Sequence, residues 1–98
     1  MDKIEHLLVC LIEECAEVQK AVSKALRFGL DDHAPDNPTV TNDIDIANEC
    51  VDLLAIIEML RDENIIPSQN ISQMLQAKKD KVAKYMMYAE ERGSLING

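Results

Sequence analysis

Residues 44–60 restrict the fold more than any other part of the chain, because they are apolar on nearly every side of a helix. Asn42 or Asp43 can cap this helix, and the early acids Asp43 and Asp45 favour its positive end. We expect the helix to run to about Glu63. A helix that is apolar all round belongs at the centre of a bundle. Two flanking helices of one chain cannot cover it fully, so we expect a homodimer or homotetramer to complete the core. The apolar residues of the segment are Ile44, Ile46, Ala47, Val51, Leu53, Leu54, Ile56, Ile57, Met59 and Leu60.

Two further helical patterns flank this segment. The first runs from Ile4 to Phe28 and ends at Gly29, and the third runs from a cap at Ser68 to about Arg92. Aromatic residues make up 3% of the chain and Trp is absent, which favours helices over a sandwich or barrel. The sequence therefore predicts an all-α fold, a bundle of three main helices per chain completed by oligomerisation. The expected seam of the first helix is Ile4, Leu8, Leu11, Cys15, Val18, Val22 and Ala25, and the expected core stripe of the third is Ile71, Leu75, Val82 and Met86.

The connection between the first two helices is long for so small a bundle. Residues 29–42, "GLDDHAPDNPTVTN", hold two of the three prolines of the chain and several Asp and Asn residues, and we expect a loop there. A loop of this length is either a lid or partner-contacting segment or an unstructured surface connection. The 98 residues suffice for a single domain, 1–98, with residues 93–98 as a loosely held tail.

Charge and composition exclude several classes of function. The formal net charge of -8 opposes binding to a nucleic-acid backbone, and we expect no nucleic acid and no membrane as partners. The N-terminus lacks a basic region followed by an unbroken apolar run, so we expect no signal peptide. The three cysteines, Cys10, Cys15 and Cys50, include no CxxC pair and lie in apolar helical settings, which indicates a reduced, cytoplasmic protein.

Acidic residues interrupt the apolar faces of the first two helices at corresponding places. In "EECAE", Glu14 borders the seam and Glu17 lies one turn on along the same side, whereas Glu13 points away. In "NECVD", Glu49 and Asp52 are three residues apart and share a face. Two facing pairs of carboxylates would raise each other's pKa steeply unless something neutralises them.

Two explanations account for these acidic pairs. Lysines of the third helix could pair with the carboxylates of the second helix. Alternatively, oxygen ligands from two facing helices could surround Mg²⁺, with Mn²⁺ as a substitute. Two such pairs on sequential helices favour the metal site.

The two acidic blocks resemble the signature of the MazG-like all-α nucleoside triphosphate pyrophosphohydrolases. "EECAE" matches E-E-x-x-E, "ECVD" matches E-x-x-D, and the resemblance covers roughly residues 4–88. It implies Mg²⁺-dependent hydrolysis of a nucleoside triphosphate to a monophosphate and pyrophosphate, for example in the house-cleaning of (deoxy)nucleotides. By this resemblance the metal ligands are Glu14, Glu17, Glu49 and Asp52, and Glu13 orients or deprotonates the attacking water. The gap between the blocks is longer than in compact members of the family.

The resemblance also implies basic residues that hold the phosphates. The third helix carries the only dense basic patch of the chain, and "KVAKY" makes Lys81, Lys84 and Tyr85 the first candidates. Lys20 and Lys24 of the first helix are the second candidates. We expect either the long loop or Tyr85 to close over the bound nucleotide.

Other functions remain open at this point. Phosphoribosyl-ATP pyrophosphohydrolases share similar acidic blocks, and a non-catalytic acidic helical oligomerisation or adaptor module would also carry charged faces. A di-iron bundle would need Glu-x-x-His pairs, and neither His6 nor His33 stands three residues after a glutamate. The preferred base and sugar cannot be named from these residues.

Overall fold

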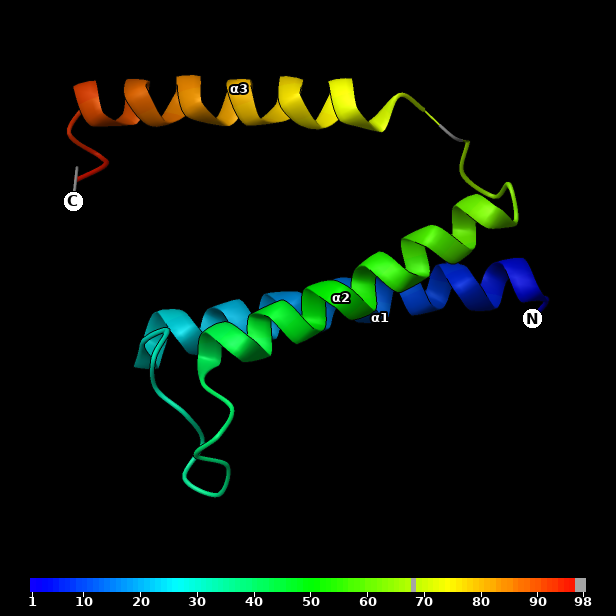
Figure 1. Cartoon of the computed structure of the whole chain (residues 1–98), viewed down its shortest axis with the longest axis horizontal. Helices are drawn as coiled ribbons and strands as arrows, with labels where there is room; N and C mark the ends of the chain where they lie inside the picture. Colours follow the sequence, from blue (N-terminus) through cyan, green and yellow to red (C-terminus); the bar gives the residue numbers. More distant parts are fainter. Residues whose placement is uncertain (68, 97–98) are drawn as a thin grey trace. The chain divides into compact units, whose positions relative to one another are not determined.

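The computed structural model describes residues 1–67 and 69–96 of the chain. All regular secondary structure among these residues is helical, apart from one isolated β-bridge between His33 and Thr41, which confirms the predicted all-α class (Figure 1). The structure divides into two compact units, Met1–Pro67 and Ser68–Gly98. The helices are α1 (Lys3–Phe28), α2 (Asn42–Asp62) and α3 (Ile71–Glu91). No helix among the described residues is both long and apolar enough to span a membrane.

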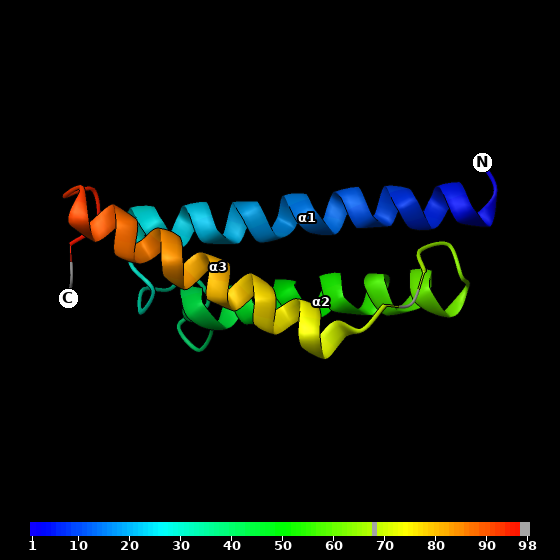
Figure 2. The same cartoon turned by 90° about the horizontal axis from the view of Figure 1, so that it is seen from above.

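Helices α1 and α2 form an antiparallel hairpin, and they lie side by side in both views of the chain (Figures 1 and 2). An ion pair stands near each end of it. At the open end, Lys3 Nζ lies 2.6 Å from Glu63 Oε1, and near the loop, Lys24 Nζ lies 2.9 Å from Asp45 Oδ2. The first pair is exposed and contributes little to stability.

Both ends of α1 follow from local sequence. Asp2 is the N-cap, and its carboxylate accepts a hydrogen bond from the Glu5 amide at 2.8 Å. At the C-terminus, the Gly29 amide donates to the Ala25 carbonyl at 2.7 Å, and Gly29 has a φ of 103°. A side chain is strained at this φ, and a Cβ added there would lie 3.2 Å from Asp31 Oδ1, so glycine suits the position.

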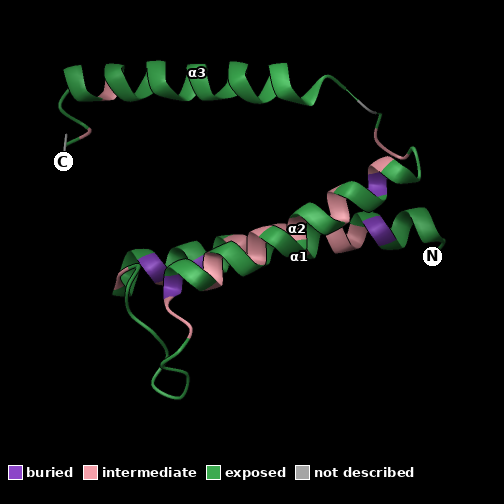
Figure 3. Cartoon of the chain, viewed as in Figure 1, coloured by how far each residue is buried: buried purple, intermediate pink, exposed green. Residues whose placement is uncertain are grey.

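The buried stripe of α1 differs from the predicted seam. Leu7, Ala21 and Ala25 are its buried residues, and Figure 3 shows buried positions of α1 toward both of its ends. Ala25 was predicted, but Leu7 and Ala21 were not. In this unit α1 packs against a single helix. Part of the predicted seam lies on a row of α1 next to the buried row, and this part is outside the contact. The predicted seam residues that are exposed are Ile4, Leu8 and Val22.

Helix α2 is less covered than its sequence predicts. Asn42 and Leu60 are its buried residues, and within the Met1–Pro67 unit its helical neighbour is α1. One neighbour covers one side of a helix, so the remaining apolar side chains of α2 stay exposed. Cover by a second copy remains a prediction. The large apolar side chains of α2 that are exposed are Ile44, Val51, Leu54 and Met59.

The N-terminus of α2 corrects the predicted cap. Thr41 is the N-cap residue, whereas Asn42 and Asp43 lie inside the first turn. Asn42 is buried at 3% exposure, and its Nδ2 donates to the Gly29 carbonyl at 2.7 Å. The side chain of Asn42 therefore binds the end of α1 and does not cap its own helix. The Thr41 hydroxyl donates instead to the Asp43 carboxylate, which lowers the pKa of Asp43.

The connection between α1 and α2 is a loop, as predicted, and hydrogen bonds close its base. The backbone amide of Asn42 donates to the Asp32 carbonyl at 2.8 Å, and the backbone amide of Asp43 donates to the Leu30 carbonyl at 2.9 Å. Nearer the tip, the Asn37 amide donates to the Ala34 carbonyl at 3.0 Å. These bonds support an ordered loop rather than an unstructured connection.

Helix α3 begins later than expected. Asn70 is the N-cap, and its side chain accepts a hydrogen bond from the Gln73 amide at 3.5 Å. Ser68, the predicted cap, lies outside the described residues. No residue of α3, all of which is described, is buried. The predicted core stripe of Ile71, Leu75, Val82 and Met86 is therefore exposed.

The chain after α3 turns back onto the end of the helix. Gly93 has a φ of 80°, and the Ser94 and Leu95 amides donate to the Ala89 carbonyl at 2.9 and 3.2 Å. This part of the predicted 93–98 tail is thus hydrogen-bonded to α3. Residues 97 and 98 lie outside the described range.

Candidate metal centre

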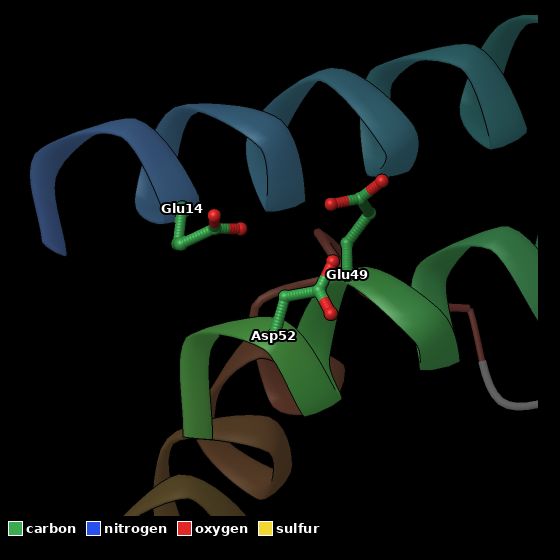
Figure 4. Close-up of side chains that lie close together, drawn as sticks. All are labelled: Glu14, Glu49 and Asp52. Carbon is green, nitrogen blue, oxygen red and sulfur yellow. The ribbon is translucent and has the colours of Figure 1, made fainter. Parts of the chain in front are cut away.

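Three carboxylates converge in the middle of the α1–α2 hairpin. Glu14 comes from α1, and Glu49 and Asp52 come from α2 (Figure 4). Each residue has one carboxylate oxygen in the cluster, and these three oxygens all lie within 4.8 Å of one another. Glu49 and Asp52 share a face because they are three residues apart, and Glu14 lies on the side of α1 that packs toward that face. The structure thus brings together three of the four predicted metal ligands.

The environment of Glu49 disfavours its charged form. Glu14 and Glu49 are partly buried and Asp52 is exposed. Loss of water around Glu49 raises the pKa of its carboxyl group, and the charges of Asp52, Glu17, Asp45 and Glu14 raise it further. Like charges therefore meet at a position from which water is partly excluded.

Among the described residues, no basic side chain of the hairpin forms an ion pair with this cluster. The ion pairs of the described residues in the Met1–Pro67 unit are Lys3–Glu63 and Lys24–Asp45. Neither pair includes Glu14, Glu49 or Asp52. Oxygen donors that lie close together and lack a counter-ion suit a hard divalent cation.

The two remaining glutamates of "EECAE" lie in different surroundings. Glu17 is exposed and falls outside the three-carboxylate cluster, but it lines a cavity of about 230 Å³ together with Glu49 and Asp45. Glu13 is exposed on α1, as its predicted outward direction requires. Ligation by Glu17 and the role of Glu13 toward water stay predictions.

The predicted phosphate-binding lysines fall into two groups. Lys20 and Lys24 line the same 230 Å³ cavity as Glu17 and Glu49, which places the second candidates beside the carboxylates. Lys81, Lys84 and Tyr85 are exposed on α3 in the Ser68–Gly98 unit. Their approach to the carboxylates stays a prediction.

Asp45 and the loop cavity are features of the site that sequence reasoning missed. Asp45 was interpreted as a residue that favours the helix dipole, yet it pairs with Lys24 and raises the pKa of Glu49. Its spacing of four residues before Glu49 places both on one face and could have revealed this. The loop cavity encloses about 570 Å³ at the C-terminal end of α1, and no spacing rule indicates it.

The cysteines take no part in the acidic cluster. Cys10, Cys15 and Cys50 are free thiols and partly buried, as expected for small apolar helical residues.

Comparison with known proteins adds no relative. No protein-family model matches the chain, and neither a curated protein nor a solved structure matches it. The functional assignment therefore rests on the side chains and their geometry.

Proposed function

We propose that the chain is a MazG-like, Mg²⁺-dependent nucleoside triphosphate pyrophosphohydrolase that releases a nucleoside monophosphate and pyrophosphate. The observation that carries this proposal is the convergence of Glu14, Glu49 and Asp52, whose carboxylate oxygens lie within 4.8 Å of one another. These residues come from the two acidic blocks that resemble the family, and they meet across two helices. A solvated surface cluster would not need to place carboxylates between packed helices.

The donor set fits a divalent cation. Three carboxylate oxygens are hard ligands of the kind that Mg²⁺ and Mn²⁺ prefer. The pKa of Glu49 is raised by the loss of water around it and then by the neighbouring negative charges, and a bound cation would offset both effects. Bound Mg²⁺ would neutralise phosphate charge and lower the pKa of its coordinated water. Glu14, Glu49 and Asp52 would hold the ion.

Residues around the cluster have complementary roles in this proposal. Glu17 completes the ligand set from the adjoining cavity, one turn along α1 from Glu14. Glu13 orients the attacking water or accepts its proton, acting from the neighbouring position on the helix.

Local cations hold the polyphosphate. The chain has a formal net charge of -8, so its overall field repels a triphosphate. Lys20 stands beside the carboxylates and supplies positive charge there, and Lys24, which is paired with Asp45, lines the same cavity. Lys81 and Lys84 supply further charge from α3, where the segment Ser68–Gly98 has five basic and three acidic residues.

A pyrophosphate-release assay tests the proposal. Standard and modified nucleoside triphosphates, together with phosphoribosyl-ATP, are incubated with the chain and Mg²⁺, with and without a chelator. We expect chelator-sensitive release of pyrophosphate, which Glu49→Gln abolishes. Release from phosphoribosyl-ATP alone would favour the sister activity. Failure of the whole panel with Mg²⁺ and with Mn²⁺ would reject the enzyme and leave an adaptor role.

Oligomerisation belongs to the same proposal. Large apolar side chains on both helices of the hairpin are exposed, including Ile12, Val51 and Leu54. A homodimer or homotetramer would bury such residues and gain about 1.5–3 kcal/mol for each side chain fully covered. Analytical ultracentrifugation checks this, and a stable folded monomer at micromolar concentration would contradict it.

A further inference from the structure

A cavity of about 570 Å³ lies at the C-terminal end of α1, outside the carboxylate cluster. Its walls come from α1, through Lys24 and Phe28, and from the loop, through Asp32, His33 and Pro35. The volume falls within the range of small-molecule sites. Asn42, which also lines the cavity, fixes the loop to α1 through its bond to the Gly29 carbonyl. The cavity is thus formed by a loop whose base is closed.

The apolar walls suit a planar ring. Phe28 is 59% exposed although it is aromatic, and it lines the cavity beside Pro35. The Arg27 guanidinium lies over the Phe28 ring at 5.0 Å from its centroid, so a planar group that stacks on Phe28 would use the other face of the ring. Any nucleobase can stack on an aromatic ring, because every base has a planar face.

The polar groups of the loop wall are hydrogen-bond acceptors. His33 Nδ1 lies 2.9 Å from the Ala34 carbonyl, and a carbonyl can only accept, so Nδ1 carries a proton and, in the neutral imidazole, Nε2 is an acceptor. The Asp32 carboxylate accepts from the His33 amide at 2.9 Å through Oδ1, and Oδ2 can accept another bond. Both residues therefore favour a ligand that donates.

One residue borders both this cavity and the cavity beside the candidate metal centre. Lys24 lines it and also lines the 230 Å³ cavity that Glu17 and Glu49 share. Glu17 and Phe28 are eleven residues apart on α1, which corresponds to about 16 Å along the helix axis. An extended nucleoside triphosphate can span such a distance from phosphate to base.

We infer that this cavity holds the nucleobase of the substrate and prefers a base with an exocyclic amino group over uracil or thymine. The inference rests on the proposed function, since the phosphates are placed at the carboxylate cluster. An amino group donates to Asp32 or to His33 Nε2. The carbonyl oxygen at the same place in uracil or thymine would face an acceptor, and the bond would be lost.

Binding without catalysis tests the base site directly. The full ¹⁵N-labelled chain is titrated with AMP, CMP, GMP and UMP in the absence of divalent metal, and amide shifts are followed by NMR. We expect shifts at Asp32, His33 and Phe28, with UMP binding about two- to tenfold more weakly than the amino-bearing monophosphates. Shifts confined to other residues, or UMP binding as tightly as CMP, would overturn the inference.

Three variants separate stacking from base selection. Phe28→Ala removes the stacking surface and should weaken all four monophosphates by about five- to 150-fold. Asp32→Asn replaces an acceptor with a group that can also donate, and it should reduce the preference over UMP while overall binding persists. His6→Ala is the matched control, because His6 is exposed on α1 about 33 Å from Phe28 along the helix axis. An unchanged dissociation constant in Phe28→Ala would reject the stacking site.

Turnover distinguishes this inference from the proposed function. If the chain hydrolyses nucleoside triphosphates but Phe28→Ala and Asp32→Asn keep the wild-type KM for ATP, CTP, GTP and UTP, the base site is wrong and the activity stands. If the monophosphates bind the cavity but no triphosphate is hydrolysed with Mg²⁺, the activity is wrong and the binding site stands. Circular dichroism confirms that each variant keeps its helices.

Discussion

Polar side chains lie between α1 and α2 at two places, and the two places differ in how charge is balanced. Near the loop, Lys24 pairs with Asp45 at 2.9 Å, and the side-chain amide of Asn42 donates to the Gly29 carbonyl at 2.7 Å. In the middle of the hairpin, Glu14, Glu49 and Asp52 place three carboxylates within 4.8 Å of one another. The loop end has its own ion pair, whereas neither ion pair of the hairpin includes the three carboxylates of the middle.

This difference separates a structural role from a binding role. A paired charge or a satisfied amide fixes the geometry of the hairpin and needs nothing from outside. A cluster of carboxylates destabilises the hairpin until a cation arrives. Four changes test whether the two places behave in these opposite ways.

Removal of one charge from the middle should have the largest effect. Glu49→Gln should reduce Mg²⁺-dependent turnover by at least about a hundredfold, because it removes a proposed ligand. Stability of the metal-free chain should stay the same or increase, because repulsion with Asp52 is relieved. Pyrophosphate release and thermal unfolding measure the two effects. Glu58→Gln, an exposed glutamate of the same helix, is the control and should change neither.

Removal of the amide at the loop end should instead destabilise the hairpin. Asn42→Ala deletes the donor to the Gly29 carbonyl at a buried position, which should lower the free energy of unfolding by about 1–3 kcal/mol. Urea unfolding measures this change. The exposed Asn48→Ala on the same helix should show no such loss. Equal stability of the two variants would show that the bond to Gly29 does not hold the loop.

The ion pair at the loop end should contribute less. Lys24 and Asp45 keep 40% and 29% of their side-chain surface, so solvent screens the pair. A double-mutant cycle with Lys24→Met and Asp45→Asn should give a coupling energy below about 1 kcal/mol that decreases with added salt. A coupling that is large and independent of salt would place the pair in a drier environment than the structure describes.

The pH dependence of stability should report the unbalanced charge. The folded-state pKa of Glu49 is raised above its ordinary value of 4.5, so the folded chain binds more protons than the unfolded chain between these two values. Between these two pKa values, the stability that Glu49 contributes is lost as pH rises. Above the folded-state pKa, the free energy of unfolding no longer changes because of Glu49. Denaturant titrations without divalent ions should show this slope in the wild type and a weaker slope in Glu49→Gln. If stability has the same pH dependence in the wild type and in Glu49→Gln, then Glu49 does not cause it.

Local patterns predicted the helices well because each depends on nearby residues. The first helix was expected over Ile4–Phe28 and occupies Lys3–Phe28, and Gly29 ends it as predicted. The second was expected to reach about Glu63 and ends at Asp62. The convergence of Glu14 with Glu49 and Asp52 was also predicted, since helical spacing fixes the faces on which carboxylates lie.

Features that depend on tertiary contacts were predicted less well. Leu7 and Ala21 are buried instead of Ile4 and Val22, because the line of contact with α2 selects one row of an apolar face that is wider than one helix can cover. Asn42 or Asp43 was expected to cap α2, yet the Asn42 side chain binds a carbonyl thirteen residues earlier in the chain. A local rule for capping cannot anticipate a partner so distant in sequence.

The closed base of the loop separates its tip from the helices. Because residues 29–33 and 41–43 are joined by hydrogen bonds, the helices do not depend on the length of the segment between them. Each doubling of a flexible loop costs only about 0.6 kcal/mol in closure entropy. Insertions and sequence changes near Asp36–Thr39 can therefore accumulate without refolding the hairpin. The tip is a position where evolution, or an engineer grafting a foreign peptide, can vary the molecule while the carboxylates stay in place.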